Sequence, residues 1–202
     1  MTRSAIRIAA AVAFAAMAVA SASAQQTVRV RGTIEKLDGN VLSVKSPDGA
    51  DLKITLTDDV KVVGVEKATP SDIRQGSYIG SAAMPQADGS QKALEVHIFP
   101  ESMRGTGEGH RPYAPVPNST MTNGTVGQTG DASDSKAVTL KYRDGEKQIV
   151  ITPGIPIVAY VIGDKSDLKV GAAITIISAT KKPDGTLEAA RVNVGRNGVV
   201  PQ

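Results

Sequence analysis

The sequence predicts an all-β protein: two tandem small β-barrels of the OB or SH3-like kind, each with about six strands and one short capping helical turn. Three observations lead to this prediction. Apolar and polar residues alternate with a period of two, as in LKITLT and QKALEVHIF, which is typical of half-buried strands. Asp-Gly pairs, which favour tight hairpin turns, begin at residues 38, 48, 88, 144 and 184. Finally, the second half of the chain resembles the first.

The N-terminus has the pattern of a secretory signal. Arg3 and Arg7 precede the apolar run IAAAVAFAAMAVA, and Ala22-Ser23-Ala24 forms a small-x-small cleavage site. The run is shorter than the roughly 20 residues that a membrane-spanning helix needs. This length favours a cleavable signal peptide at residues 1–24 and argues against an uncleaved anchor. Cleavage after Ala24 would give a soluble periplasmic or secreted protein. Because the chain has no cysteine, disulfides and thiolate metal sites are excluded.

Two repeats organise the remainder of the chain. GTIEKLDGNVLSVKSPDG at 32–49 resembles GTVGQTGDASDSKAVTLKYRDG at 124–145, and segments 52–79 and 88–99 resemble 147–174 and 184–195. We therefore predict one barrel over residues 28–99 and a second over residues 120–197. A unit of this size buries only a marginal core by itself, so we expect the two units to pack together.

Six strands are predicted in the first repeat, over 28–37, 41–46, 51–57, 60–65, 77–84 and 91–99. One capped turn interrupts each repeat: TPSDIRQG has Thr69 as N-cap, Pro70 in the first turn and Gly76 at the exit, and DKSDLKVG repeats the pattern. Ile73 and Leu168 within these turns are predicted to close one end of each sheet.

Residues 100–119, PESMRGTGEGHRPYAPVPNS, form a Pro/Gly-rich joint between the repeats. Its four prolines and three glycines argue against a regular strand or helix. A structureless joint of this length is unusual in a compact protein. We therefore expect it to be ordered and to pack along one barrel.

The duplicated strand, hairpin and capped-turn pattern resembles an uncharacterised class of exported bacterial OB-like β-barrel domains, designated only as a domain of unknown function. The joint text EVHIFPESMRGTGEGHRP, followed by STMTNGTV, is similar to a two-domain subgroup, some members of which carry a name linking them to metal transport permeases. The resemblance implies a fold and an exported location, and it supplies no catalytic residues. A permease needs several membrane spans, and no later stretch of the sequence is long and apolar enough for one.

The strongest candidate chemistry is a metal site formed by His97, His110, Glu95 and Glu108, with Glu101 nearby. Glu95 and His97 are two residues apart on a predicted strand and so share a face. Reversal of the chain after Pro100 would bring Glu108 and His110 close to them. Imidazole and carboxylate ligands suit zinc, copper or nickel. The alternative is an ordinary solvated strand face, and the second repeat has Arg191 and Asn193 where the first has Glu95 and His97.

Other candidate sites are weaker. Arg104, Arg111 and Tyr113 could contact an anionic partner from the joint. Met84, Met103 and Met121 could bind Cu(I), although methionine usually fills gaps in a core. A hydrolase would need a nucleophile and base, and neither a G-x-S-x-G elbow nor a cysteine is present. The adjacent acids Asp58 and Asp59 are better explained as a solvated turn.

Charge and aromatic content argue against nucleic acid. The full chain has 23 basic and 20 acidic residues, and removing Arg3 and Arg7 with the signal leaves 21 against 20, too balanced to attract phosphates. The five aromatic residues after the signal are too scattered to stack bases.

The sequence therefore predicts a non-enzymatic envelope protein that has no cofactor and binds a small ligand or a protein partner. The alternative is an accessory protein that binds a divalent metal, and a third possibility is an envelope hydrolase. The sequence does not indicate an oligomeric state.

Overall fold

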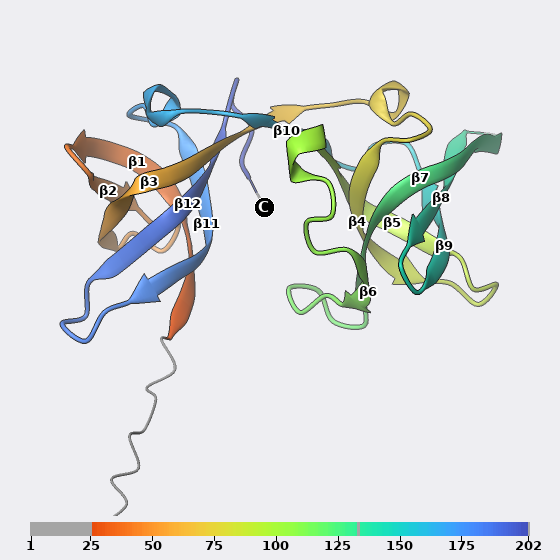
Figure 1. Ribbon diagram of the computed structural model, residues 1–202, viewed down its shortest axis with the longest axis horizontal. Coiled ribbons are helices and arrows are strands. Elements are labelled where there is room, and N and C mark those ends of the chain that lie inside the picture. Colours follow the sequence, from red (N-terminus) through yellow and green to blue (C-terminus); the bar gives the residue numbers. More distant parts are fainter. Residues whose placement is uncertain (1–25, 133, 202) are drawn as a thin grey trace, which may run out of the picture.

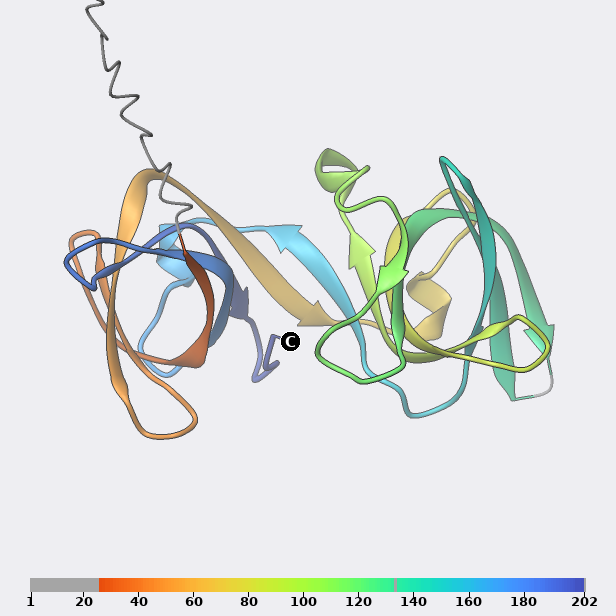
Figure 2. The same cartoon turned by 90° about the horizontal axis from the view of Figure 1, so that it is seen from below.

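The computed structural model describes residues 26–132 and 134–201. It consists of two β-barrels side by side, with a long strand and the C-terminal end of the chain between them (Figures 1 and 2). The helical elements are three short 3-10 turns, η1 (Pro70–Asp72), η2 (Glu101–Met103) and η3 (Lys165–Asp167). The prediction of an all-β barrel protein is therefore confirmed. The predicted signal peptide over residues 1–24 and its cleavage site lie outside the described residues.

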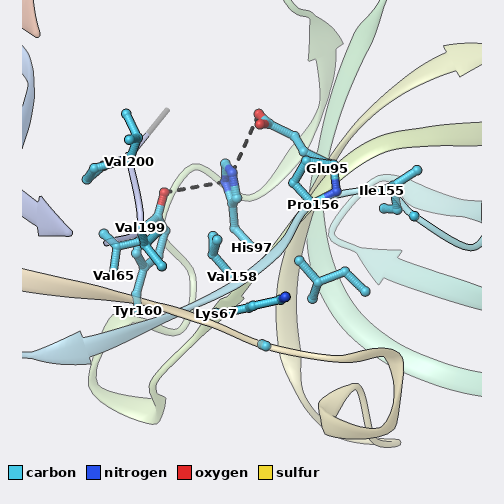
Figure 3. A pocket seen from close by; sticks show the side chains of 14 residues that line it. Val65, Lys67, Glu95, His97, Ile155, Pro156, Val158, Tyr160, Val199 and Val200 are labelled. Atoms are coloured by element: carbon cyan, nitrogen blue, oxygen red, sulfur yellow. Dashed lines mark hydrogen bonds and ion pairs between the residues drawn. The ribbon is translucent and has the colours of Figure 1, made fainter. Parts of the chain in front are cut away.

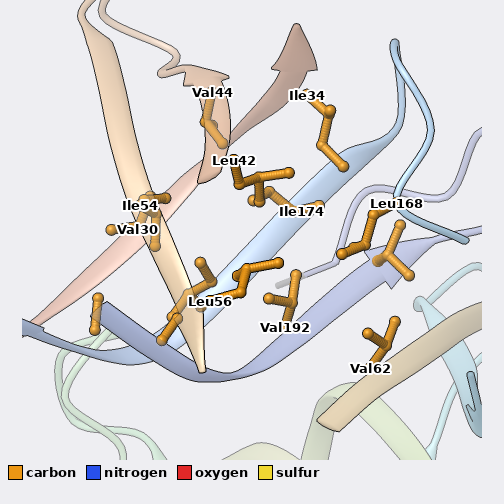
Figure 4. Packing of buried hydrophobic residues seen from close by; sticks show 14 residues of the cluster. Val30, Ile34, Leu42, Val44, Ile54, Leu56, Val62, Leu168, Ile174 and Val192 are labelled. Carbon is orange, nitrogen blue, oxygen red and sulfur yellow. The ribbon is translucent and has the colours of Figure 1, made fainter. Parts of the chain in front are cut away.

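The first barrel contains the first three and the last two strands of the described chain, coloured orange and blue in Figure 1. Its strands follow the order β12-β11-β1-β2-β3. All neighbours are antiparallel except β12 and β3, which pair in parallel and close the barrel. Ile34, Leu42, Ile54 and Leu56 point into its core (Figure 4). The strands are β1 (Thr27–Asp38), β2 (Val41–Lys45), β3 (Asp51–Lys67), β11 (Ala173–Lys181) and β12 (Leu187–Gly195).

The second barrel contains the middle of the chain. Its strands follow the order β5-β4-β7-β8-β9, and a parallel pairing of β5 with β9 closes it. Ile79, Val96, Leu140 and Ile149 lie in its core. The strands are β4 (Tyr78–Pro85), β5 (Gln91–Phe99), β7 (Thr120–Ala132), β8 (Ser135–Tyr142) and β9 (Gly145–Ile151).

Each barrel therefore combines strands from both repeats. The first repeat contributes β1, β2 and β3 to the first barrel and β4 and β5 to the second, and the second repeat makes the reciprocal contribution. The predicted domains, one barrel over residues 28–99 and one over 120–197, are wrong in this respect. The repeats are real, but they have exchanged their last two strands.

The continuous strand β3 explains the exchange. The predicted strands 51–57 and 60–65 are a single strand of 17 residues, and the predicted break at Asp58 and Asp59 is an irregularity at which the register of β3 shifts against β12. Such an irregularity in the pairing interrupts the ladder locally without reversing the strand. The chain consequently leaves the first barrel along β3 and enters the second barrel at β4, giving each barrel five principal strands and not six.

A two-stranded ladder between the barrels marks a pseudo-two-fold axis. The end of β3 pairs antiparallel with β10 (Ile157–Ile162), and Val65 lies opposite Tyr160. The repeat offset of 95 residues, which aligns 52–79 with 147–174, makes Val65 and Tyr160 equivalent positions. Because equivalent residues face one another, the ladder lies on the axis that relates the two barrels.

The capped turns are confirmed and follow the exchange. Thr69 precedes η1, and Asp164 precedes η3 and accepts a hydrogen bond from the Ser166 backbone N–H. Ile73 and Leu168, 1% and 5% exposed, close the ends of the barrels. Ile73 packs in the core of the second barrel and Leu168 in that of the first, so each turn caps the barrel that its following strands enter.

The segment over residues 100–119 is not a joint between barrels. It connects β5 to β7, which both belong to the second barrel. The prediction that it contains no strand is also wrong, because β6 (Gly109–Pro112) pairs with β7; a short edge strand tolerates a proline at its end. The predicted packing along one barrel is confirmed by the Thr106 carbonyl, which accepts hydrogen bonds from Tyr78 Oη at 3.2 Å and Asn123 Nδ2 at 2.9 Å.

Candidate functional site

Two cavities lie between the barrels and share His97 and Tyr160 in their walls. The first, here called the tail cavity, has a volume of about 310 Å³ and is lined by Val65, Val158, Val199 and Val200 among others (Figure 3). The C-terminal residues that cover it are held by a hydrogen bond of 2.8 Å from Thr175 Oγ1 to the Pro201 carbonyl. The second, the arginine cavity, has a volume of about 250 Å³ and is lined by Arg29, Arg111 and Arg191.

A polar group at the shared wall, the His97 cluster, consists of Glu95, His97, Tyr113 and Tyr160. His97 is 9% exposed; its Nε2 lies 3.5 Å from Glu95 Oε1 and its Nδ1 lies 3.4 Å from Tyr160 Oη (Figure 3). Tyr113 Oη donates to Glu95 Oε1 at 3.1 Å. The cluster joins β5, β10 and the segment after β6, so residues distant in sequence meet at one point.

Strand periodicity explains the direction of the β5 side chains. Val96 is fully buried in the core of the second barrel, so Glu95 and His97 on either side of it face outward. Strand β10 pairs in parallel beside β5, and that outward face is covered by the side chain of Tyr160 from β10, which packs on His97, and by Tyr113, which contacts Glu95. The predicted shared face of Glu95 and His97 is thus present, but it faces the space between the barrels and is largely shielded from solvent.

Burial and neighbouring charges determine which groups of the His97 cluster are protonated. Burial would raise the pKa of Glu95, but hydrogen bonding to His97, the charge of His97 and hydrogen bonding to Tyr113 together lower it. Burial raises the pKa of Tyr160 to about 12, and the charge of Glu95 adds to the increase. Burial and the Glu95 carboxylate also raise the pKa of Tyr113. At neutral pH, an ionised carboxylate therefore lies among protonated phenols that can donate hydrogen bonds.

Stability above pH 10 is expected to depend on Tyr160. Its folded pKa of about 12 exceeds the ordinary value of 10.0, so the phenol stabilises the fold fully below pH 10, and this contribution is lost as the pH rises towards 12. A difference of two units corresponds to about 2–3 kcal/mol. Denaturant unfolding at pH 9 and at pH 12 measures this loss of stability. Tyr160→Phe is expected to remove this part of the pH dependence of stability, and the control Tyr142→Phe is expected to retain it. Equal losses in the wild type and Tyr160→Phe would contradict the assignment.

The two histidines do not form a common metal site. His97 pairs with Gly80, Gly80 with Asn123, and Asn123 with Gly109. Since neighbouring strands lie about 4.8 Å apart, position 109 is roughly 14 Å along the sheet from His97. His110, one residue later, faces the opposite side of the sheet.

The other predicted ligands are also occupied elsewhere. His110 Nδ1 lies 2.8 Å from Thr122 Oγ1, Glu108 accepts a hydrogen bond from the Arg143 backbone N–H, and Glu101 pairs with Arg104. Within residues 26–132 and 134–201, no three histidine or acidic side chains are grouped so that they could hold a metal ion. The predicted site is wrong because the chain after Pro100 returns along β7 and not across β5.

Of the three predicted partner-binding residues, two reach the cavities. Arg111 lines the arginine cavity and donates to the Gly107 carbonyl at 2.6 Å, and Tyr113 belongs to the His97 cluster. Arg104 instead holds its own segment in place: it binds Glu101, donates to Thr125 Oγ1 and the Gly76 carbonyl, and lies over the Tyr78 ring. Its donors are therefore engaged within the barrel.

Sequence reasoning missed the contribution of the first barrel. Arg29 on β1 and Arg191 and Asn193 on β12 form the wall opposite β5. The signal was present in the repeat alignment, where Arg191 and Asn193 replace Glu95 and His97. Without the exchanged topology, however, nothing indicated that these equivalent positions face one another.

In the part of the chain that the structure describes, no helix has the length and apolar character needed to cross a membrane. Comparison of the chain with known protein families, curated proteins and solved structures returned no match.

Proposed function

We propose that this chain is a non-enzymatic ligand-binding protein of the bacterial cell envelope, and that its small ligand binds between the two barrels. The observation that carries the proposal is the pair of cavities that meet at His97 and Tyr160 and are lined by both barrels. Small-molecule sites occur preferentially in concave, mostly apolar spaces between domains, with a few polar groups to fix orientation. The location in the envelope rests on the predicted signal peptide.

The tail cavity has the composition expected of such a site. Val65, Val158 and Val199 supply apolar surface, and the His97 cluster supplies hydrogen-bonding groups at one end. The His97 ring packs against Tyr160 with ring centroids 5.4 Å apart, and Phe99 packs on the other side of Tyr160 at 5.1 Å. These contacts hold the polar groups in one orientation before a ligand arrives, which reduces the entropic cost of binding.

The same contacts favour binding over hydrolysis. Among the described residues, the side-chain partners of His97 are the carboxylate of Glu95 and the phenol of Tyr160, and no serine or threonine hydroxyl is hydrogen-bonded to it. A nucleophile within hydrogen-bonding distance of its base is the first requirement of the hydrolase that the sequence left as a third alternative.

A cavity-filling substitution tests the proposal. Val158→Trp should occupy the tail cavity, whereas Ile162→Trp on the same strand, where Ile162 is 64% exposed, is the matched control. Uncharged aromatic fragments are screened against the chain without residues 1–24 by NMR, with the amide signals of β5 and β10 as readout. We expect binding fragments to shift these signals, Val158→Trp to weaken their affinity at least about tenfold, and the control to retain it. Fragments that bind only elsewhere, or with equal affinity to Val158→Trp, would contradict the proposal.

A further inference from the structure

The arginine cavity gathers positive charge from both barrels. Arg29 comes from β1, Arg191 from β12 and Arg111 from β6, and all three line the same cavity of about 250 Å³. Two of these strands belong to the first barrel and one to the second. The charge is therefore assembled by the folded arrangement and is not a run of basic residues along the chain.

In the described part of the chain, these three guanidinium groups form no ion pair, in contrast to Arg104 and Arg196. Arg104 pairs with Glu101, and Arg196 pairs with both Glu66 and Asp167. Within residues 26–132 and 134–201, no carboxylate forms an ion pair with Arg29, Arg111 or Arg191, and the hydrogen-bond partner of Arg111 is a backbone carbonyl. The nearby carboxylate of Glu95 is hydrogen-bonded by Tyr113 and lies beside His97, and it attracts Arg29 without forming an ion pair with it, so at most one carboxylate acts on the three guanidinium groups. The cavity is thus left with a net positive charge that an anion would offset.

The two repeats differ in charge between the barrels, while their buried core positions agree. In the aligned strands β5 and β12, the inward positions Val96 and Val192 are both valine and fully buried. The outward position is glutamate in one repeat, Glu95, and arginine in the other, Arg191. The pseudo-two-fold axis therefore relates an acidic, hydrogen-bonding wall to a basic wall. Glu95 lines the tail cavity and Arg191 the arginine cavity, so the acidic and the basic position belong to different cavities.

Apolar groups accompany the charge. Phe99, Met103 and Met121 line the cavity together with Tyr160, and Met121 is 7% exposed. A fully hydrated inorganic ion would leave these surfaces unused. A guanidinium group binds a carboxylate through two parallel hydrogen bonds, and methionine and aromatic side chains favour an apolar body beside it.

We propose that the arginine cavity binds a small organic acid, with its carboxylate against Arg29, Arg111 and Arg191 and its apolar body against Phe99 and the two methionines. This inference rests on the proposed ligand-binding function and names the class of ligand. The influence of Arg29 and Arg191 on the Tyr160 phenol, whose pKa both guanidinium groups lower, is consistent with their charges acting inside the cavity.

Three probes and three variants test the inference on the chain without residues 1–24. Calorimetric titration compares phenylacetate with its uncharged counterpart phenylacetamide and with inorganic phosphate. We expect phenylacetate to bind with one-to-one stoichiometry and at least about tenfold more tightly than phenylacetamide, because hydrogen bonds to charged groups are the stronger ones. Phosphate, which supplies charge but no apolar body, should bind more weakly than phenylacetate.

Charge-removing variants locate the binding. Arg29→Gln and Arg191→Gln should each weaken phenylacetate binding about tenfold. Arg31→Gln is the matched control: Arg31 lies on the same strand and the same outward face as Arg29 but does not line the cavity, so a change of at most about twofold is expected from screened long-range charge. Unchanged melting temperatures would show that all three variants remain folded.

Each contrary result has a defined meaning. Equal binding of phenylacetate and phenylacetamide, or equal effects of Arg29→Gln and Arg31→Gln, would overturn the inference. Phosphate that binds more tightly than phenylacetate would overturn the organic-acid class. If uncharged fragments still bind the tail cavity in the Val158→Trp experiment while no acid binds here, this inference alone fails; if no compound binds either cavity, the proposed function fails with it.

Discussion

Two separate chains, residues 26–117 and 118–202, are expected to be unfolded as monomers and to form both barrels when mixed in equal amounts. Residues 26–117 contain β1, β2 and β3 of the first barrel but lack β11 and β12, which close it. The same fragment also contains β4 and β5 without β7, β8 and β9. Each fragment alone would therefore leave unpaired strand edges and open apolar faces, which are unfavourable in water.

The cut between Pro117 and Asn118 is chosen because both residues are exposed and lie between β6 and β7, so no strand is interrupted. Circular dichroism and sedimentation at low concentration report the state of each fragment, and the intact chain is the reference. Mixing should restore cooperative unfolding in a species with one copy of each fragment. A monomeric fragment 26–117 that unfolds cooperatively by itself would mean that one repeat can close its own barrel, contrary to the exchange.

The second large effect is expected from the capping turns. Ile73→Ala and Leu168→Ala should each lower the free energy of unfolding by about 2–4 kcal/mol, because each removes a buried side chain from a barrel end and leaves a cavity. Ile73 is 1% exposed and Leu168 5%. Denaturant unfolding measures the total loss. Val170→Ala, at a position 72% exposed beside Leu168, is the control and should change stability by less than about 0.5 kcal/mol.

The location of the effect tests the topology independently. Ile73 belongs to the first repeat but packs in the core of the second barrel, so Ile73→Ala should accelerate amide hydrogen exchange in β7, β8 and β9. Leu168→Ala should do the same in β1, β2 and β3. Local openings report the stability of the surrounding cooperative unit. Faster exchange in β1 and β2 after Ile73→Ala, with β7 to β9 still protected, would indicate that each turn caps its own repeat.

Periodicity explains why the strands could be predicted while their partners could not. Alternating residues such as Leu52, Ile54 and Leu56 identify a strand with one buried face whatever lies next to it. The repeats, however, have equivalent inward residues, with Val96 matching Val192 and Ile98 matching Val194. The inward residues of β5 and β12 therefore do not identify their partners; the unbroken path of β3, which carries the chain out of the first barrel, selects them. Similarity between the repeats conceals the exchange, because local sequence contains no preference for one pairing.

The candidate site was likewise predictable from the sequence only in part. The shared outward face of Glu95 and His97 follows from their spacing on a strand, and it was predicted correctly. The pairing of His97 with His110 failed because it assumed how the chain returns after Pro100, and β6 returns along β7 instead. Arg29 and Arg191 could not be placed near His97 from sequence, since they belong to strands of the other barrel.

By itself, the sequence determined the all-β class, most of the strands, the capped turns with Ile73 and Leu168, and the duplication of the chain. All of these depend on residues within one short segment, where alternation, turn chemistry and capping act locally. The tertiary structure alone decided which repeat closes which barrel and which side chains meet between them. Both depend on β3, which continues past Asp58 and Asp59 despite the register shift there and carries the chain from the first barrel into the second.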